Sequence, residues 1–394
     1  MLREAPESYL EGLLALYNHA LEDGIFPAQW KIARIKAILK SPNRNPSLIS
    51  SLRPVSLLPC KGKLLERLIL NVIEPQLSLA THPNQFGCTR GRCTEVQLHS
   101  CLARHAHPSK ELLYRPFAEL STKNRTPRIG VTRGCPQGSV LGTAFWNLAF
   151  SGLLLELDSE EAVVLEAQTR AELVLKAEKV SRRIQEWCTF AILELSAGKT
   201  QSVLFRGSED HQHPFRFTAG NGRLQAKEVV RYLGIELSRK HSCSPQLENV
   251  ASKSTRIAPA VRGLSGSDWG IPYACHLKYI QSVFLSSVMY GASTWWNNPT
   301  KAQRERVLRI QRACLIAMTK AYETCSTDAL LVLSGTMPLD LMLDARVALV
   351  TVKSPSRVCV PIQPDLKILL ESCESIQEKR DAIRQWATTC WQEQ

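Results

Sequence analysis

The chain has 394 residues, of which 49 are Lys or Arg and 36 are Asp or Glu, so its formal net charge is +13. With 44% hydrophobic and 22% charged residues, its composition is that of a globular protein and excludes a disordered or collagen-like chain. The 13 cysteines form no CxxC pair, which argues against a disulfide framework or a zinc ribbon. An intracellular location is therefore expected, with nucleus and cytoplasm not distinguished.

The positive charge is concentrated in one part of the sequence. Residues 24–135 hold 18 Lys and Arg against five Glu and no Asp, whereas the rest of the chain is balanced at 31 and 31. A surface of this kind attracts a polyanion by releasing counterions, without reading its sequence. Two interpretations stay open: a nucleic-acid-binding surface, or a solvated basic face that has no partner.

Hydrophobic periodicity predicts the first elements. A helix is expected over residues 8–22, and apolar residues alternating with basic ones over 33–40 predict a strand with one basic face. A polar linker follows at 41–51. The apolar stripe over 64–73 predicts a second helix, which should end near Pro75.

The stretch from Gly134 to Leu155 carries no charge and is long enough to span a bilayer. Pro136 and Asn147 within it favour a buried loop followed by a helix, so no membrane partner is expected.

The remaining elements make the chain α+β up to about residue 240 and mostly helical beyond. A 4-3-4-3 apolar repeat over 173–187 predicts an amphipathic helix. Strands are expected at 203–205, in a hairpin around 220–222 and over 229–237. Helical patterns dominate from about residue 248.

Short motifs occur in a fixed order along the chain. They are GIFP at 24–27, LRPVS at 52–56, GKLLE at 62–66, QFG at 85–87, RGRCT at 90–94, CPQGS at 135–139, YLGI at 232–235 and YGA at 290–292. Each is weak alone. Together, over about residues 10–350, they make the chain similar to the reverse transcriptases of non-LTR retrotransposons of the R1 and jockey groups.

This resemblance implies an α+β fold with right-hand, reverse-transcriptase-like fingers and palm and a mostly helical thumb and C-terminal region. The regions expected are basic fingers at 1–100, a degraded palm at 101–240, a helical thumb at 241–350 and a C-terminal helical extension at 351–394. The antiparallel palm sheet is expected to be incomplete.

The resemblance also implies a nucleotide-binding set, namely Lys40, Arg53, Gln137, Gly138 and Lys199. An Arg at position 53 suits neutralisation of a triphosphate, while Gly138 lets the backbone approach a base pair and Gln137 offers an amide. The alternatives are a surface Arg before Pro54, an ordinary Pro-Gln-Gly turn before a helix, and a solvated Lys199.

Two further groups of residues follow from the same resemblance. Tyr232, Leu233 and Gly234 resemble a primer grip, although Tyr232 alone is equally consistent with core packing. The residues expected to contact nucleic acid are Lys31, Arg34, Lys36, Lys63, Arg90 and Arg92.

The family's metal ligands are missing. In the family, two Mg²⁺ ions are held by an aspartate-bearing strand between QFG and CPQG and by an Ala-Asp-Asp hairpin further on. This sequence has no Asp between Asp23 and Asp158 and no Asp-Asp dipeptide anywhere. Asp158, Glu160 and Glu161 lie near the second place, but they form an acidic turn without a third ligand or a rigid strand.

The sequence therefore predicts an internally deleted reverse transcriptase, truncated at both ends, that binds no Mg²⁺ and does not polymerise DNA. The expected partner is an RNA template or an RNA–DNA hybrid, and no protein partner is indicated. The alternatives are a non-catalytic RNA-binding protein, an active polymerase with other carboxylates, and an inert translated relic.

Overall fold

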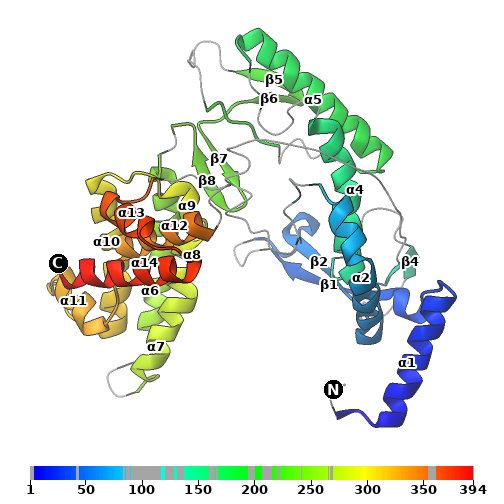
Figure 1. Cartoon of the computed structure of the whole chain (residues 1–394), viewed down its shortest axis with the longest axis horizontal. Coiled ribbons are helices and arrows are strands. Elements are labelled where there is room, and N and C mark those ends of the chain that lie inside the picture. The colour runs from blue at the N-terminus through cyan, green and yellow to red at the C-terminus, as the bar shows by residue number, and fades with distance from the viewer. Residues whose placement is uncertain are drawn as a thin grey trace. The chain divides into compact units, whose positions relative to one another are not determined.

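The structure is a computed structural model (Figure 1). It describes residues 4–40, 44–82, 85, 89, 117–119, 128–130, 137–158, 165, 167–193, 200–205, 215–219, 222–240, 242–264, 266, 269–353 and 361–393. The chain forms two compact units. The first contains residues 1–92, 105–166 and 178–195, and the second contains 93–104, 167–177 and 196–394. The predicted α+β class is confirmed, whereas the division into four regions stays a prediction.

The first unit combines long helices with one mixed sheet. Its described elements are α1 (Glu7–Glu22), η2 (Ala28–Lys31), β1 (Ile32–Leu39), η3 (Ile49–Ser51), β2 (Leu52–Leu57), α2 (Cys60–Ala80), β3 (Phe117–Glu119), β4 (Arg128–Gly130), α4 (Val140–Asp158) and most of α5 (Arg170–Phe190).

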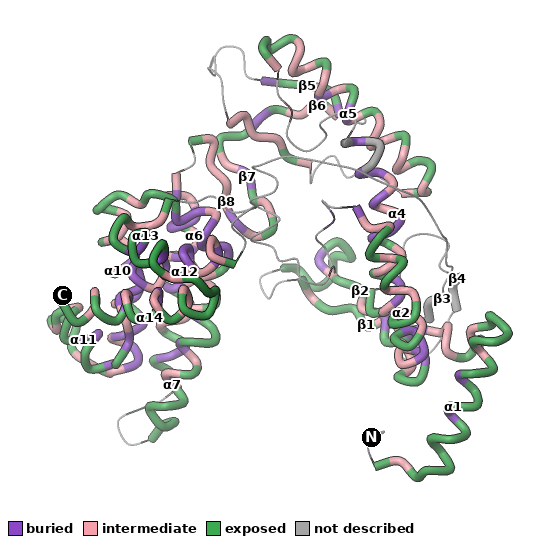
Figure 2. Tube along the Cα trace, viewed as in Figure 1, coloured by how far each residue is buried: buried purple, intermediate pink, exposed green. Residues whose placement is uncertain are grey.

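A small aromatic core joins α1, η2 and α2. Leu13 and Tyr17 are the buried residues of α1, which is otherwise largely exposed (Figure 2). The Tyr17 hydroxyl donates a hydrogen bond to the carbonyl of Lys61 at 2.9 Å. A Cβ on Gly62 would lie 3.1 Å from the Cβ of Trp30, so the GKLLE motif begins with glycine where α2 passes close to η2.

The sheet has the strand order β2-β1-β3-β4. Strands β1 and β2 are antiparallel, and Ile38 lies opposite Arg53. Strand β3 runs parallel to β1, with Ile32 opposite Phe117, and β4 is antiparallel to β3. A parallel pair requires a crossover, and the chain makes one here because α2 and the residues after it separate β1 from β3.

Two details of the predicted elements were wrong. Helix α2 does not end near Pro75 but continues to Ala80. A proline removes one backbone hydrogen bond, and the exposure of Asn71 and Pro75 on this helix lets water take up the bond that is lost. The strand expected at 203–205 is only an isolated bridge from Val203 to Lys227, because no neighbouring pair extends it among the described residues.

Helix α4 corresponds to the uncharged stretch and is a core element, as predicted. Leu153 and Leu157 pack against Val180 of α5. Among the described residues, no helix is both long and apolar enough to cross a membrane.

The second unit is mostly helical beyond two β-hairpins. Its described elements are β5 (Arg216–Ala219), β6 (Gly222–Gln225), β7 (Val229–Tyr232), β8 (Ile235–Ser238), α6 (Ser244–Arg262), α7 (Tyr273–Tyr279), the π-helical η5 (Ile280–Leu285), α8 (Ser286–Met289), α9 (Ala292–Trp295), α10 (Lys301–Thr319), α11 (Thr327–Ser334), α12 (Leu339–Lys353), α13 (Pro364–Glu371) and α14 (Ile376–Gln392). The hairpins around 220–222 and over 229–237 are thus confirmed.

A large core holds the second unit together. Ile235 of β8, Leu247 of α6, Phe284 of η5 and Val307 of α10 are all at most 1% exposed. Leu343 of α12 joins the same cluster. Each element contributes an apolar stripe at its own period, which is why the helical pattern read from the sequence predicted this region well.

Candidate nucleic-acid interface

The β1–β2 ribbon carries an exposed basic face. Residues directly opposite each other on paired strands project to the same side, so the register places Arg34 and Lys36 of β1 on one face with Arg53 of β2. All three are exposed, whereas Ala33 and Ser56 on the other face are buried. Three of the predicted residues therefore form one surface, which we call the ribbon face.

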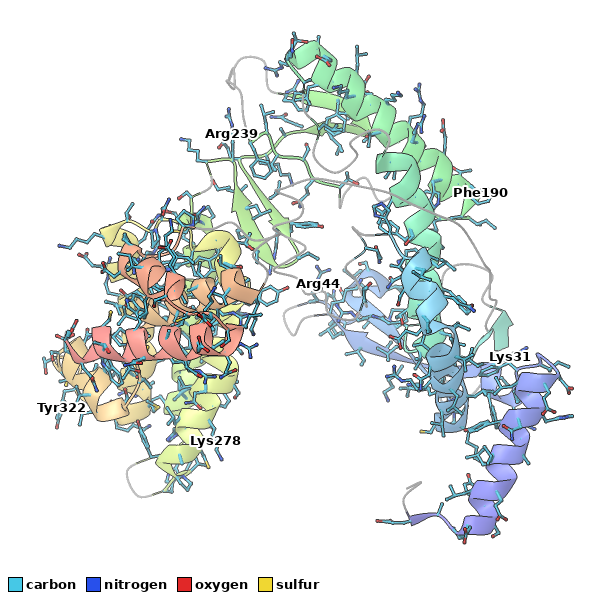
Figure 3. All side chains as sticks on the ribbon, in the orientation of Figure 1. Lys31, Arg44, Phe190, Arg239, Lys278 and Tyr322 are labelled. Carbon is cyan, nitrogen blue, oxygen red and sulfur yellow. The ribbon has the colours of Figure 1, made fainter. Side chains whose placement is uncertain are left out.

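Lysine side chains near the ribbon face differ in their surroundings. Lys40 directly follows β1 and donates a hydrogen bond from Nζ to the carbonyl of Ser50 at 2.8 Å. Lys31 and Lys63 are half-buried and lie in η2 and α2, so neither belongs to the ribbon. Lys31 precedes strand β1, and Arg44 follows the same strand at the opposite end of the ribbon (Figure 3). Arg44 is an exposed cation that none of the motifs contains.

The Gln137-Gly138 turn lies against strand β2. The backbone N–H of Ser56 donates a hydrogen bond to the carbonyl of Gln137 at 2.9 Å. Gly138 has φ of +131°, and a Cβ there would overlap the Ser56 carbonyl oxygen. The glycine is therefore required by the close approach of two backbones. The Gln137 side chain is exposed.

A buried carboxylate holds the start of α4. Glu66 of α2 is 2% exposed, and its Oε1 accepts a hydrogen bond from the Ser139 hydroxyl at 2.9 Å. Its Oε2 accepts the N–H of Val140 at 2.7 Å, at the positive end of the helix. LRPVS, GKLLE and CPQGS are thus joined through Ser56, Glu66 and Ser139. Sequence reasoning missed Glu66, although an acidic residue inside an apolar stripe was the available signal.

Gln85, the first residue of the QFG motif, contacts α4. Gln85 donates a hydrogen bond from Nε2 to Oδ1 of Asn147 at 2.7 Å, and both residues are 7% exposed. The N–H of His82 donates to the Ser151 hydroxyl one helical turn further along. These contacts explain why the uncharged part of α4 contains the polar residues Asn147 and Ser151.

In the second unit, the residues that resemble a primer grip form a tight turn. Leu233 and Gly234 have φ of +49° and +87°, as a two-residue hairpin of the type I′ class requires. The Tyr290 hydroxyl donates to the Leu233 carbonyl at 2.8 Å, which brings the YLGI and YGA motifs together. Tyr232 is half-buried and packs against the main core.

Several predicted residues lie outside the described part of the chain. These are Arg90, Arg92, Lys199, Glu160 and Glu161. Asp158 is the last residue of α4, and its side chain is not described.

The residues that the structure describes do not fit a two-metal centre. Across the described ranges, no three His, Cys, Asp or Glu side chains lie close enough together to hold a metal ion. The sequence itself lacks an aspartate from residue 24 to residue 157.

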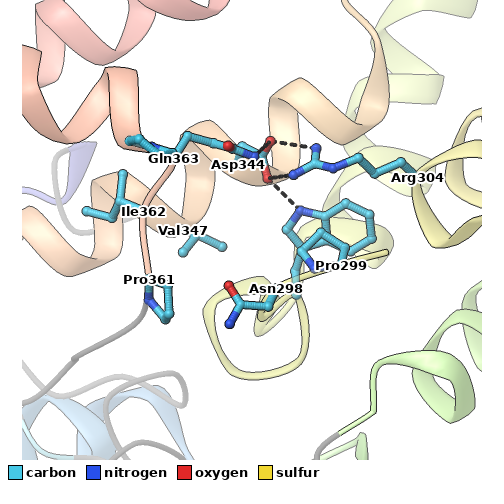
Figure 4. A pocket seen from close by; sticks show the side chains of 10 residues that line it. Asn298, Pro299, Arg304, Asp344, Val347, Pro361, Ile362 and Gln363 are labelled. Carbon is cyan, nitrogen blue, oxygen red and sulfur yellow. Dashed lines mark hydrogen bonds and ion pairs between the residues drawn. The ribbon is translucent and has the colours of Figure 1, made fainter. Parts of the chain in front are cut away.

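A pocket of about 470 Å³ in the second unit is lined by none of the predicted residues (Figure 4). Asp344 lies in its wall and accepts hydrogen bonds from Arg304 at 2.7 and 3.2 Å and from Trp296 Nε1 at 2.8 Å. Burial works to lower the pKa of Arg304, but hydrogen bonds and charge interactions with Asp344 and Asp340 together outweigh this and raise the pKa. The hydrogen bonds between Arg304 and Asp344 stabilise the contact of α10 with α12.

The chain is similar to proteins of retrotransposable elements, although no family model matches it. It is 26% identical over 432 aligned positions to the putative 115 kDa protein of the type-1 element R1DM of Drosophila melanogaster, covering 97% of this chain and 42% of that protein. It is 26% identical to the Pol polyprotein of an R1 element of Bradysia coprophila, over 86% of this chain and 39% of that protein. The same identity holds for the RNA-directed DNA polymerase of the mobile element jockey of D. melanogaster, over 75% and 38%.

These relatives are the reverse-transcriptase-bearing polyproteins of non-LTR retrotransposons. The chain is a homologue of the R1 and jockey members of that class, at about 26% identity over most of its length. It spans about two fifths of the length of these relatives. The 432 aligned positions exceed the 394 residues of this chain by 38, so at least 38 residues of the R1DM protein have no counterpart here.

Proposed function

We propose that this chain is a reverse-transcriptase-like protein that binds nucleic acid and lacks polymerase chemistry. In this proposal, residues 1–100 are fingers, 101–240 an incomplete palm, 241–350 a thumb and 351–394 a helical extension. Its ligand is an RNA template or an RNA–DNA hybrid, and binding takes place in the nucleus or the cytoplasm.

The loss of chemistry is carried by one observation. The motifs that flank both metal-binding segments of the family are present and in order, yet the first segment contains no aspartate and the second contains no Asp-Asp pair. The 38 or more residues of the R1DM protein without counterpart here support the loss of an internal segment. Polymerase chemistry needs carboxylates around two metal ions, because the metals activate the attacking oxygen and stabilise the leaving group.

Binding is supported by the ribbon face. Arg34, Lys36 and Arg53 are exposed cations on one side of a rigid two-stranded ribbon. Phosphate contacts by such side chains release counterions and position the nucleic acid without reading bases. The proposed binding is therefore independent of sequence and dependent on salt.

Primer extension tests the chemistry. The purified chain is incubated with a primed RNA template, Mg²⁺ and deoxynucleotides, beside an active polymerase as the positive control. We expect no incorporation. Incorporation that chelator abolishes and that Asp158→Ala removes would contradict the proposal and would favour the active-polymerase alternative.

Fluorescence anisotropy of a labelled single-stranded RNA tests the binding. We expect the triple variant Arg34→Glu/Lys36→Glu/Arg53→Glu to reduce the slope of log affinity against log salt by about 2, because each lost single-strand phosphate contact contributes about 0.7. The matched control is Arg182→Glu, an exposed cation on α5 that should leave the slope unchanged. Absence of any salt-dependent binding by the unmodified chain would favour the inert relic.

A further inference from the structure

A second group of cations lies in the second unit, between the β7–β8 hairpin and helix α6. Lys253 and Arg256 are three residues apart on α6 and therefore lie on one face of it. Arg231 of β7 is close enough to Lys253 to repel its charge, as Arg256 does. We call these three residues the α6 cluster.

The hairpin is fixed against this helix. The N–H of Glu236 on β8 donates a hydrogen bond to Oε1 of Gln246 on α6 at 3.0 Å. The same oxygen accepts from Asn249 at 3.3 Å. Ile235 and Leu247 pack beneath in the main core, each fully buried. The three cations are therefore carried on two elements that do not move independently.

The α6 cluster is not neutralised by the protein. Among the described residues, Glu236 is the one carboxylate that acts on the charge of Lys253, and its Oε1 lies 3.7 Å from Nε of Arg231, a side chain that is 59% exposed. Neither Lys253 nor Arg256 has an ion-pair partner within the part of the chain that the structure describes. Three cations facing one carboxylate leave two positive charges uncompensated.

The arrangement costs stability. Burial lowers the pKa of Lys253, and repulsion by Arg231 and Arg256 lowers it further, against the opposing effect of Glu236. A lowered pKa on a lysine means that the folded state disfavours the ammonium form relative to the unfolded chain. The protein would be more stable without this charge, so an external anion is the natural compensation.

We propose that the α6 cluster binds the phosphodiester backbone of a nucleic acid, as a second contact separate from the ribbon face. Two uncompensated charges on a rigid support attract phosphates, and the side chains of Arg231 and Arg256 are exposed to them. The proposal rests on the nucleic-acid binding proposed above and adds a site in the other unit.

The test uses a signature that a purely structural lysine would not give. Lys253→Met keeps an unbranched side chain of nearly the same length and removes its charge. We expect the melting temperature of the full chain to rise by about 2 °C, while affinity for single-stranded RNA falls about fivefold and the salt slope falls by about 0.7. The matched control, Lys367→Met on the exposed face of α13, should change none of the three.

Inorganic phosphate provides a readout that does not depend on RNA. At equal ionic strength, phosphate should raise the melting temperature of the unmodified chain relative to chloride, and Lys253→Met and Arg256→Gln should each reduce that gain. Equal phosphate stabilisation in the unmodified chain and both variants overturns the α6 site. If RNA binding is absent altogether, the proposed function fails first. If RNA binds and depends on the ribbon face alone, only the α6 site fails.

Discussion

Two glycines of the α4 region differ in what a methyl group would meet. Gly138 lies in the turn before the helix with φ of +131°, and its added Cβ would overlap the Ser56 carbonyl. Gly152 lies inside α4, where an added Cβ meets nothing within 4 Å. Both are glycines in motif-rich sequence, but the backbone requires only the first.

Substitution by alanine should therefore act in opposite directions at these positions. We expect Gly138→Ala to lower the free energy of unfolding by about 2 kcal/mol, because the turn must move away from β2. Gly152→Ala should raise it by about 0.5–1 kcal/mol, because alanine favours a helix. Urea unfolding measures both. Equal effects of the two substitutions would mean that the contact between Gly138 and Ser56 is not maintained.

At the scale of elements, two carboxylates of α12 face the same arginine. Asp344 accepts four hydrogen bonds, from Arg304 twice and from Trp296 and Gln363. Asp340 lies one turn away, 3.6 Å from Arg304, and its buried Oδ1 has no hydrogen-bond partner among the described residues. Burial raises the pKa of Asp340 more than Arg304 lowers it.

This difference predicts opposite effects of neutralising the two residues. A raised pKa on an acid means that the folded state holds the proton more tightly, so stability falls as the pH rises from the unfolded to the folded pKa. Asp340→Asn should then raise the free energy of unfolding at neutral pH by about 1 kcal/mol, and the melting temperature with it. At acidic pH the substitution should change both little. Asp344→Asn should cost about 2 kcal/mol or more at neutral pH, because it leaves Arg304 without its main partner.

Melting curves from neutral to acidic pH check this pair. The curve of the Asp340→Asn variant should be flatter than that of the unmodified chain. A loss of stability in both variants at neutral pH would show that Asp340 acts as a partner of Arg304, in the same way as Asp344.

At the scale of the whole molecule, the two basic surfaces belong to different units. The ribbon face lies in the first unit and the α6 cluster in the second, and they share no side chain. Independent contacts contribute additively to the free energy of binding. We expect Arg34→Glu/Arg53→Glu and Arg231→Glu/Arg256→Glu to lower affinity for a long single-stranded RNA separately, and their combination to lower it by the sum within about 0.5 kcal/mol.

Anisotropy titrations of the three variants at one salt concentration measure this. If the combined variant has the same RNA affinity as the weaker-binding of the two double variants, one surface alone contacts the RNA.

The sequence determined the elements because each has its own period of apolar residues. The 4-3-4-3 repeat of α5, the alternation in β1 and the hairpin over 229–237 were all readable, since one face of each element is buried and the other is not. The predicted helix end near Pro75 was wrong because the effect of a proline depends on whether the helix is exposed there.

The motifs in order also predicted the similarity to R1 and jockey proteins, and the missing aspartates are the basis of the proposal that polymerase chemistry is lost. Only the tertiary structure decided which residues meet. Glu66 with Ser139, Ser56 with Gln137, and Tyr290 with Leu233 are 73, 81 and 57 residues apart in the sequence. Hydrogen bonds over such separations depend on how the elements pack, and local periodicity carries no information about that packing. The α6 cluster also depends on this packing, because Arg231 comes close to Lys253 only where the β7–β8 hairpin lies against helix α6.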